Sequence, residues 1–250
     1  MTHAIYPSLA NKTVVVTGGG SGIGAELVAG FVRQKARVFF LDIAEDSSRS
    51  LVAQLGNDVQ FFKCDITNID ALRSTFAAIE AKAGPIHTLV NNAANDDRHK
   101  TMDVTAAYWD NRIAVNLRHQ FFATQAVVPG MKAAGGGSII NLGSVSWHLG
   151  MADLAVYETA KAGIEGLTRA LARDFGPDRI RVNCVIPGAV RTPRQIALWH
   201  TPEEEAKILD QQCIKVRVDP IDIAAMVLFL ASDDARLCTG HNYWVDAGYR

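Results

Sequence analysis

The sequence predicts one α/β domain, a mostly parallel, doubly wound sheet of seven strands with helices on both faces. Short β-branched or aromatic runs alternate with longer amphipathic stretches along the chain. The first such run passes through a glycine-rich turn straight into a helical pattern. The length of 250 residues, 48% of them hydrophobic, fits one full-sized core better than two small ones, and no linker or internal repeat divides it.

The predicted strands are short and rich in Val, Ile, Phe and Thr. They cover residues 12–17, 37–41, 59–63, 87–90, 138–142, 181–185 and 243–245. Helical periodicity fills the segments between them, at about 22–34, 47–55, 69–83, 104–115, 117–132, 156–175, 202–212 and 220–231. Strands that alternate with helices pair in parallel, because each crossover helix returns the chain to the end of the sheet at which the previous strand began. The run Gly135-Gly136-Gly137 predicts a helix C-terminal turn before the fifth strand.

Charge and cysteine usage exclude several classes of partner. The 25 basic and 26 acidic residues leave a net charge of -1 without a basic stripe, so no nucleic acid is expected. No apolar run is long enough to span a bilayer, and residues 1–7 lack the basic and apolar regions of an export signal. The four cysteines, at positions 64, 184, 213 and 238, lack disulfide or zinc spacing. We therefore expect a cytoplasmic enzyme with a small-molecule ligand, no membrane partner and no metal.

The glycine-rich turn after the first strand predicts a dinucleotide site. Its sequence is Thr17-Gly18-Gly19-Gly20-Ser21-Gly22-Ile23-Gly24, in which Gly18, Gly22 and Gly24 give the spacing G-x-x-x-G-x-G. Residues without Cβ let the backbone bend sharply and approach a pyrophosphate, which then meets the free N–H groups of the helix that follows. Glycines also serve tight turns for structural reasons alone, but the strand–glycine–helix context favours a Rossmann-like cofactor site.

Asp42 closes the second strand at the spacing, about 20 residues, where this type of fold places an acid on the adenosine ribose. A carboxylate there repels a 2′-phosphate, and the neighbours Ser21 and Ile43 are not basic. NAD is therefore favoured over NADP; the alternative is that Asp42 only caps the next helix. Asp65 could bond the adenine edge and Asn91-Asn92-Ala93-Ala94 could line the cofactor groove, although either group could equally form a turn.

A serine and a tyrosine–lysine pair predict the chemistry. Tyr157 and Lys161 stand at i and i+4 of a predicted helix, so their side chains share one face. To act as a base near neutral pH, the tyrosine needs its pKa lowered by about three units, and a lysine ammonium about 4 Å away supplies roughly that effect. Tyr157 would then take the proton of an alcohol while Ser144 holds the substrate oxygen. Asn116 could link Lys161 to solvent through a water, whereas the tyrosine–lysine pair alone is more often structural.

These pieces together resemble the short-chain dehydrogenase/reductase family over almost the whole chain. The matching residues are 17–24, Asn91-Asn92-Ala93, Asn116, Ser144, Tyr157-x-x-x-Lys161 and Pro187-Gly188. The resemblance implies a catalytic tetrad of Asn116, Ser144, Tyr157 and Lys161. The cofactor-binding residues expected are Gly18, Gly20, Ser21, Gly22, Ile23, Gly24, Asp42, Ile43, Asp65, Ile66, Asn92, Ala93, Tyr157, Lys161, Pro187, Val190 and Thr192. Ala94 departs from the family, which more often has glycine there.

Polar loops after the fourth, fifth and sixth strands predict a hydroxyl-rich substrate, because substrates lie outside the carboxyl ends of such strands. The substrate-binding residues expected are Asn95, Asp96, Ser144, Ser146, Trp147, Tyr157 and Trp199. A sugar needs donors and acceptors for its hydroxyls and an aromatic face for its C–H edge, whereas a steroid or acyl pocket would be apolar. The alternative is that Asp96, Asp97 and Arg98 form a solvated ion-pair cluster or a subunit contact.

Residues 95–100, 146–150 and 238–241 also resemble bacterial aldopentose 1-dehydrogenases. That resemblance implies oxidation of D-xylose or L-arabinose at the anomeric carbon to a lactone, by a homotetramer. Two rival functions stay open: a 3-oxoacyl or other carbonyl reductase, including a secondary-alcohol dehydrogenase, and a catalytically silent NAD-binding regulator. Asp42 argues against the first, because biosynthetic reductases usually use NADPH, and the complete tetrad argues against the second.

Overall fold

Seven parallel strands form the centre of the molecule. The computed structural model describes residues 3–56 and 58–249, so Met1 and Thr2 of the N-terminal segment discussed above lie outside it. The strands are β1 (Thr13–Thr17), β2 (Arg37–Asp42), β3 (Val59–Lys63), β4 (Thr88–Asn91), β5 (Gly137–Leu142), β6 (Ile180–Pro187) and β7 (Asn242–Val245). They pair in the order β3-β2-β1-β4-β5-β6-β7, with every pairing parallel. The prediction of a seven-stranded, doubly wound sheet is confirmed.

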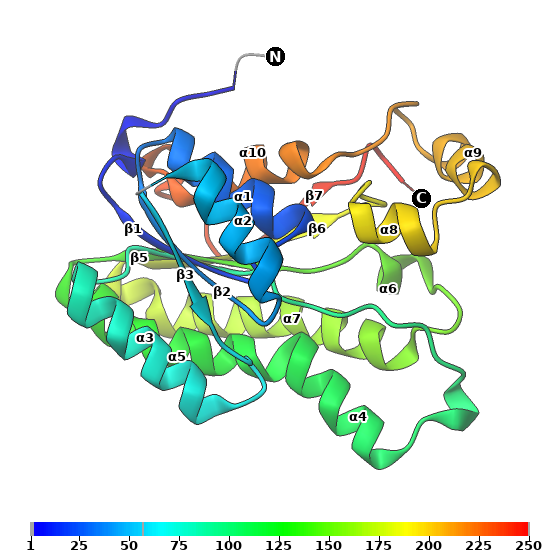
Figure 1. The fold of residues 1–250 in the computed structure, drawn as a ribbon, viewed down its shortest axis with the longest axis horizontal. Helices are drawn as coiled ribbons and strands as arrows, with labels where there is room; N and C mark the ends of the chain where they lie inside the picture. Colours follow the sequence, from blue (N-terminus) through cyan, green and yellow to red (C-terminus); the bar gives the residue numbers. More distant parts are fainter. Residues whose placement is uncertain (1–2, 57, 250) are drawn as a thin grey trace.

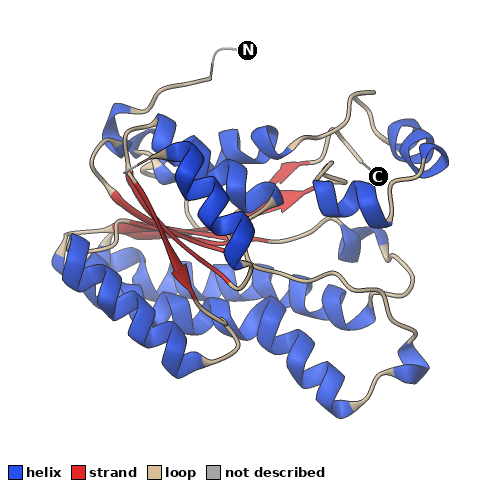
Figure 2. Cartoon of the chain, viewed as in Figure 1, coloured by secondary structure: helices blue, strands red, loops and turns tan. Residues whose placement is uncertain are grey.

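Helices cover both faces of this sheet (Figures 1 and 2). One face carries α1 (Gly22–Arg33), α2 (Glu45–Leu55) and α10 (Pro220–Ala231), and the other carries α3 (Ile69–Ala83), α5 (His119–Ala133) and α7 (Ala155–Phe175). The remaining helices are α4 (Ala106–Ile113), α6 (Ser146–Leu149), α8 (Pro193–Leu198) and α9 (Pro202–Gln211). Within the described residues, no helix is both long and apolar enough to cross a bilayer.

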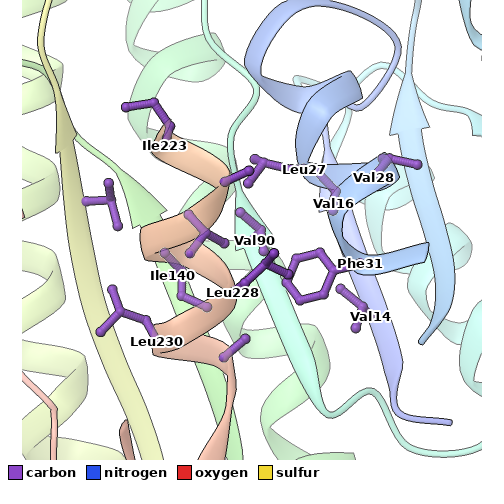
Figure 3. Packing of buried hydrophobic residues seen from close by; sticks show 14 of the residues in the cluster. Val14, Val16, Leu27, Val28, Phe31, Val90, Ile140, Ile223, Leu228 and Leu230 are labelled. Atoms are coloured by element: carbon purple, nitrogen blue, oxygen red, sulfur yellow. The ribbon is translucent and has the colours of Figure 1, made fainter. Parts of the chain in front are cut away.

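Apolar side chains between α1, α10 and the sheet form one of the buried cores (Figure 3). All five residues of β1 are buried, which is typical of a parallel strand covered on both faces. Phe31 of α1 and Leu228 of α10 lie side by side in this core, over Val14 and Val90 of the sheet. A second cluster, which includes Phe76 of α3, fills the space under the other face. The two cores fix the strands, and therefore the loops at their carboxyl ends.

Two local features differ from the sequence prediction. The chain does not break between α4 and α5, because Ala114–Arg118 continue as one π-helical turn. A π turn holds one extra residue within a continuous helix, and apolar periodicity alone does not reveal it. The short helices α6 and α8 were not predicted, because four and six residues are too few to show a period. The turn predicted at Gly135–Gly137 is present, and both Gly135 and Gly136 have positive φ.

Candidate functional site

One cavity of about 760 Å³ lies at the carboxyl ends of the strands, where the strand order reverses between β1 and β4. Most of the residues predicted for cofactor, substrate and chemistry line it. They are Gly18, Ser21, Gly22, Ile23, Gly24, Asp42, Ile43, Asp65, Ile66, Asn92, Ala93, Asn95, Asp96, Ser144, Ser146, Tyr157, Lys161, Pro187, Val190, Thr192 and Trp199. The other three, Gly20, Asn116 and Trp147, lie outside the lining. Residues from six different loops thus meet in one place.

The glycine turn has the shape that a bound pyrophosphate requires. A Cβ on Gly24 would lie 1.9 Å from the carbonyl oxygen of Gly18, so no other residue fits there. Gly18 and Gly22 both have positive φ. The N-cap residue of α1, Ser21, makes no capping hydrogen bond, which leaves the first N–H groups of the helix available to an anion. The residues present therefore fit the phosphate end of a dinucleotide.

The side chain of Asn92 ties this turn to β4. Its Nδ2 donates to the carbonyl oxygens of Thr17 and Gly18, at 3.0 and 2.9 Å. In return, the hydroxyl of Thr17 accepts hydrogen bonds from the backbone N–H groups of Asn92 and Ala93, each at 3.1 Å. Asn92 therefore lines the cavity and also fixes the distance between the two central strands at their carboxyl ends.

The Asp42 carboxylate at the end of β2 binds the backbone of the glycine turn and of the start of α2. Its Oδ2 accepts the N–H of Gly20 at 2.8 Å, and its Oδ1 accepts the N–H of Ala44, the N-cap residue of α2, at 2.9 Å. It thus closes the turn and also lines the cavity. Gly20 lies behind the turn, since a Cβ there would meet the Ser48 hydroxyl.

The nearby basic side chains are already paired. Arg49 and Lys63 both form ion pairs with Glu45, at 2.5 and 3.0 Å. To bind a 2′-phosphate beside Asp42, Arg49 or Lys63 would first have to break its ion pair with Glu45. In the next loop, Asp65 accepts both the N–H and the hydroxyl of Thr67 through Oδ1. One oxygen of Asp65 thus shapes the loop, and the residue still lines the cavity.

Ser144, Tyr157 and Lys161 meet at the other end of the cavity. The Ser144 side chain lies close enough to the Tyr157 hydroxyl to lower the pKa of that tyrosine. The hydroxyls of Ser144 and Ser146 are 2.9 Å apart, and the Ser146 N–H donates to the Ser144 hydroxyl at 3.2 Å. The ammonium of Lys161 donates to the carbonyl oxygen of Leu142 at 2.8 Å and lies 5.4 Å from the centre of the Tyr157 ring. A substrate hydroxyl at this point would lie between the hydroxyls of Ser144 and Tyr157, close to the ammonium of Lys161.

Burial is the main cause of the pKa shifts of Tyr157 and Lys161 in the cofactor-free protein. It lowers the pKa of Lys161 to about 8. It also raises the pKa of Tyr157, with a further contribution from the Asp96 carboxylate, while the Ser144 hydrogen bond and Arg98 act in the opposite direction. In the protein without cofactor, burial therefore outweighs the effect that is expected of Lys161 on the pKa of Tyr157. The positive charge of an oxidised nicotinamide would act in the opposite direction to burial and favour the phenolate of Tyr157.

Asn116 lies in the π turn and is fully buried. Its Oδ1 accepts the N–H of Asn95 at 2.8 Å, and its Nδ2 donates to the carbonyl oxygens of Asn95 and Arg112. The side chain therefore holds the loop after β4 rather than the cavity wall. His119, which the sequence did not single out, is also fully buried, and burial together with Lys161 lowers its pKa to about 3. It is a neutral neighbour of the lysine.

The two loops at the substrate end are joined across the cavity mouth by charged groups. Arg194 of α8 forms ion pairs with Asp96 at 3.3 Å and with Asp97 at 2.6 Å. The Gln195 amide donates to Asp96 at 2.6 Å. The alternative of an ion-pair cluster therefore holds for both aspartates, and Asp96 also lines the cavity. These partners lie almost 100 residues apart, so only the fold could bring them together.

Of the two tryptophans predicted at the substrate, Trp199 lines the cavity and Trp147 does not. The guanidinium of Arg98 lies 5.2 Å from the centre of the Trp199 ring, and both residues line the cavity. Trp147, in contrast, points away from it, and its indole N–H donates to Glu165 at 2.8 Å. The one-turn helix α6 places Trp147 on the side opposite the two serines, which is why it does not join Trp199.

Comparison with known proteins agrees with this geometry. A family model described as enoyl-(acyl carrier protein) reductase matches residues 18–250. The chain is 62% identical over 253 residues to a protein named D-xylose 1-dehydrogenase from Caulobacter vibrioides, with 100% of both chains covered. The chain belongs to the short-chain dehydrogenase/reductase family. It is accordingly an oxidoreductase of the dehydrogenase type that uses a nicotinamide cofactor and acts on a small molecule.

Two further matches cover nearly the whole chain. A probable galactose dehydrogenase, GalD, from Rhizobium meliloti is 47% identical over 247 residues, with 97% of this chain and 96% of that protein covered. Among solved structures, a putative short-chain alcohol dehydrogenase from Sinorhizobium meliloti superposes with a TM-score of 0.91 at 29% identity, covering 97% of this chain and 98% of that one. The dehydrogenase scaffold is thus shared from end to end.

Proposed function

We propose that this dehydrogenase oxidises an aldopentose, D-xylose or L-arabinose, at C1 with NAD and forms the aldonolactone. The observation that carries this proposal is the polar substrate end of the cavity, where Asn95, Asp96 and Gln195 present hydrogen-bonding groups beside Ser144 and Tyr157. The 62% identity to a protein named D-xylose 1-dehydrogenase supports it. Asp42, with Arg49 and Lys63 already paired to Glu45, supports NAD over NADP.

The residues divide the work along the cavity. The glycine turn would hold the pyrophosphate at the start of α1, and Asp42 would accept hydrogen bonds from the adenosine ribose. When bound, the nicotinamide supplies the acceptor for the hydride that leaves C1 and a positive charge next to the active site. That charge opposes the burial that raises the pKa of Tyr157.

At the substrate, Tyr157 removes the proton of the C1 hydroxyl while Ser144 donates a hydrogen bond to the same oxygen. Lys161, held by the Leu142 carbonyl, favours the phenolate through its charge. Asn116 acts through its hydrogen bonds to the backbone N–H and carbonyl groups of Asn95, which keep the loop after β4 in place. Loss of one proton and one hydride from C1–OH leaves the C=O of the lactone.

A substrate panel tests the proposal. The two pentoses, several hexoses including galactose, simple secondary alcohols and, in the reverse direction, acyl ketones are compared by NADH or NADPH absorbance with each cofactor. We expect the highest kcat/KM for a pentose with NAD, followed by proton release as the lactone opens to the acid. A secondary alcohol or an acyl ketone with far higher kcat/KM would refute the sugar assignment and favour the carbonyl-reductase alternative.

We also propose that the enzyme is a homotetramer. Trp109 of α4 and Phe121 of α5 are exposed although both are large and aromatic. A Cβ on Gly166 of α7 would meet no atom within 4 Å among the described residues, so another helix could approach closely at that point. Light scattering coupled to size-exclusion chromatography measures the mass directly. A mass of one chain, 27.1 kDa, at micromolar concentration would refute this proposal.

A further inference from the structure

A largely buried carboxylate lies outside the cavity and receives three hydrogen bonds. The side chain of Glu165 is only 12% exposed. Its Oε1 accepts the indole N–H of Trp147 and the Nε2–H of His148, both at 2.8 Å. Its Oε2 accepts the Nδ2–H of Asn242, at the start of the edge strand β7. One side chain of α7 thus joins α6 to the last strand of the sheet.

The segment that Glu165 holds is the one that contains Ser144. Ser144 and Ser146 line the cavity, and α6 begins at Ser146. The next two residues, Trp147 and His148, are two of the three donors to Glu165. Within five residues, the chain therefore places two hydroxyls in the cavity wall and two rings outside it. The backbone N–H groups of Gly143 and Val145 bind β6, and only Val145 separates Ser144 from the helix, so a movement of α6 acts on Ser144 through one residue.

Helix α6 cannot hold this position by itself. It has four residues, and an isolated helical turn of that length is unstable in water. Its rings instead pack at tilted angles: Trp147 and His148 have centroids 3.6 Å apart with planes at 33°, and His148 packs against Trp244 of β7 at 4.2 Å and 53°. Such contacts resist the approach of one ring to the next but allow the rings to slide past one another. The shared carboxylate oxygen is the contact that fixes them within the plane.

Glu165 also follows the catalytic face of α7. It comes four residues after Lys161, which comes four after Tyr157, so the three side chains project in succession from one face of the helix. The same rigid helix therefore carries Tyr157 and the support of Ser144.

We propose that Glu165 is a positioning residue for Ser144, which it holds beside the Tyr157 hydroxyl through Trp147 and His148. The inference rests on the proposed roles of Ser144 and Tyr157 in the reaction. Removal of the carboxylate leaves both ring donors of α6 without their acceptor, so the turn relaxes and the serine hydroxyl leaves its place. A displacement of about 1 Å in an active site costs up to about a hundredfold in rate.

A double-mutant cycle tests whether Glu165 acts through Ser144. Glu165→Ala, Ser144→Ala and the double variant are compared in kcat and KM, with whichever alcohol the wild-type enzyme oxidises fastest. We expect Glu165→Ala to lower kcat by about ten- to a hundredfold. In the Ser144→Ala background, the same change should lower kcat by less than about twofold, because the residue that it positions is already gone. Full additivity, or an unchanged kcat in folded Glu165→Ala, would overturn the proposal.

Two readouts are independent of turnover. The emission of Trp147, isolated as the difference from a Trp147→Phe variant, should change in Glu165→Ala, whereas the dissociation constant of NAD should stay within about twofold. Glu165→Gln keeps an oxygen for both ring donors, so it should restore most of kcat and the wild-type emission. Asp174→Ala removes an exposed carboxyl further along α7 and is the matched control, with no change expected.

A folding defect does not remove the test. If Glu165→Ala is insoluble, Trp147→Phe keeps the ring and removes one of the two donors, and kcat should fall by about three- to tenfold. Wild-type kcat in Trp147→Phe would then refute the positioning role. If the wild-type enzyme oxidises another alcohol but no pentose, the sugar proposal fails while the cycle on that alcohol still decides the role of Glu165.

Discussion

The carboxylate of Asp42 holds the glycine turn and also places a negative charge at the cavity. Two substitutions at Asp42 test the two effects. Its two oxygens accept the N–H groups of Gly20 and Ala44. Asp42→Asn keeps one of the two oxygen acceptors and removes the charge that lies at the cavity. Asp42→Ala removes both. A comparison of the two variants therefore assigns cofactor preference to the charge and turn stability to the hydrogen bonds.

The magnitude follows from the exposure of the site. A unit charge about 5 Å from a charge of the 2′-phosphate repels it by about 1–3 kcal/mol at an effective dielectric between about 20 and 80. We therefore expect the ratio of kcat/KM with NADP to that with NAD to rise by about ten- to a hundredfold in both variants. Asp42→Ala should also lose about 1–2 kcal/mol of unfolding free energy, less than two fully buried charged hydrogen bonds, because the carboxylate is partly exposed.

The assay is a titration of each variant with both cofactors, followed by kinetics at fixed pH and ionic strength, with denaturant unfolding in parallel. The dissociation constant of NAD should increase in Asp42→Ala, since the ribose hydrogen bonds are lost. The reasoning is refuted if the wild-type enzyme already prefers NADP, or if Asp42→Asn leaves the ratio unchanged. An unchanged ratio would mean that the charge of Asp42 plays no part in cofactor choice.

Three more predictions concern the catalytic end and the turn. Tyr157→Phe should fold normally but lose turnover by about a hundredfold or more, and near-normal turnover would remove Tyr157 as the base. Burial lowers the pKa of Lys161 from its usual 10.5 to about 8, so the charged lysine destabilises the fold below pH 8 and no longer does so above pH 10.5. Lys161→Met should thus raise the unfolding free energy at pH 7 by about 1–3 kcal/mol, with a gain that shrinks from pH 8 to 10.5, while activity falls; a pH-independent difference would contradict this. Gly24→Ala places a methyl against the Gly18 carbonyl and should abolish measurable NAD binding by calorimetry, whereas unchanged binding would show that the turn can move.

The parts of the site that the sequence predicted are those governed by local rules. The glycine turn is recognisable because each glycine meets a steric requirement within a few residues. Tyr157 and Lys161 share a face because four residues make about one helical turn, whatever the rest of the fold does. The parallel sheet follows from the alternation of strands and helices.

The residues that the sequence misplaced depend on contacts between distant segments. Trp147 was expected at the substrate, but its side is decided by a one-turn helix and by Glu165 of α7. Asn116 was expected to link Lys161 to solvent through a water, which stays a prediction; the structure adds that a π turn directs its side chain to the backbone of Asn95. Neither a four-residue helix nor a π turn has a period that a sequence pattern can show.

The sequence by itself determined that this chain folds as a doubly wound dinucleotide-binding domain with a tyrosine–lysine pair, because those features depend on neighbours within one strand, turn or helix. Only the tertiary structure decided which side chains close the substrate end and how each proton site titrates. Arg194 meets Asp96 across almost 100 residues. Burial, which no local pattern measures, raises the pKa of Tyr157 and lowers that of Lys161. Long-range pairing and desolvation both depend on the whole packed molecule, and so does the chemistry of this site.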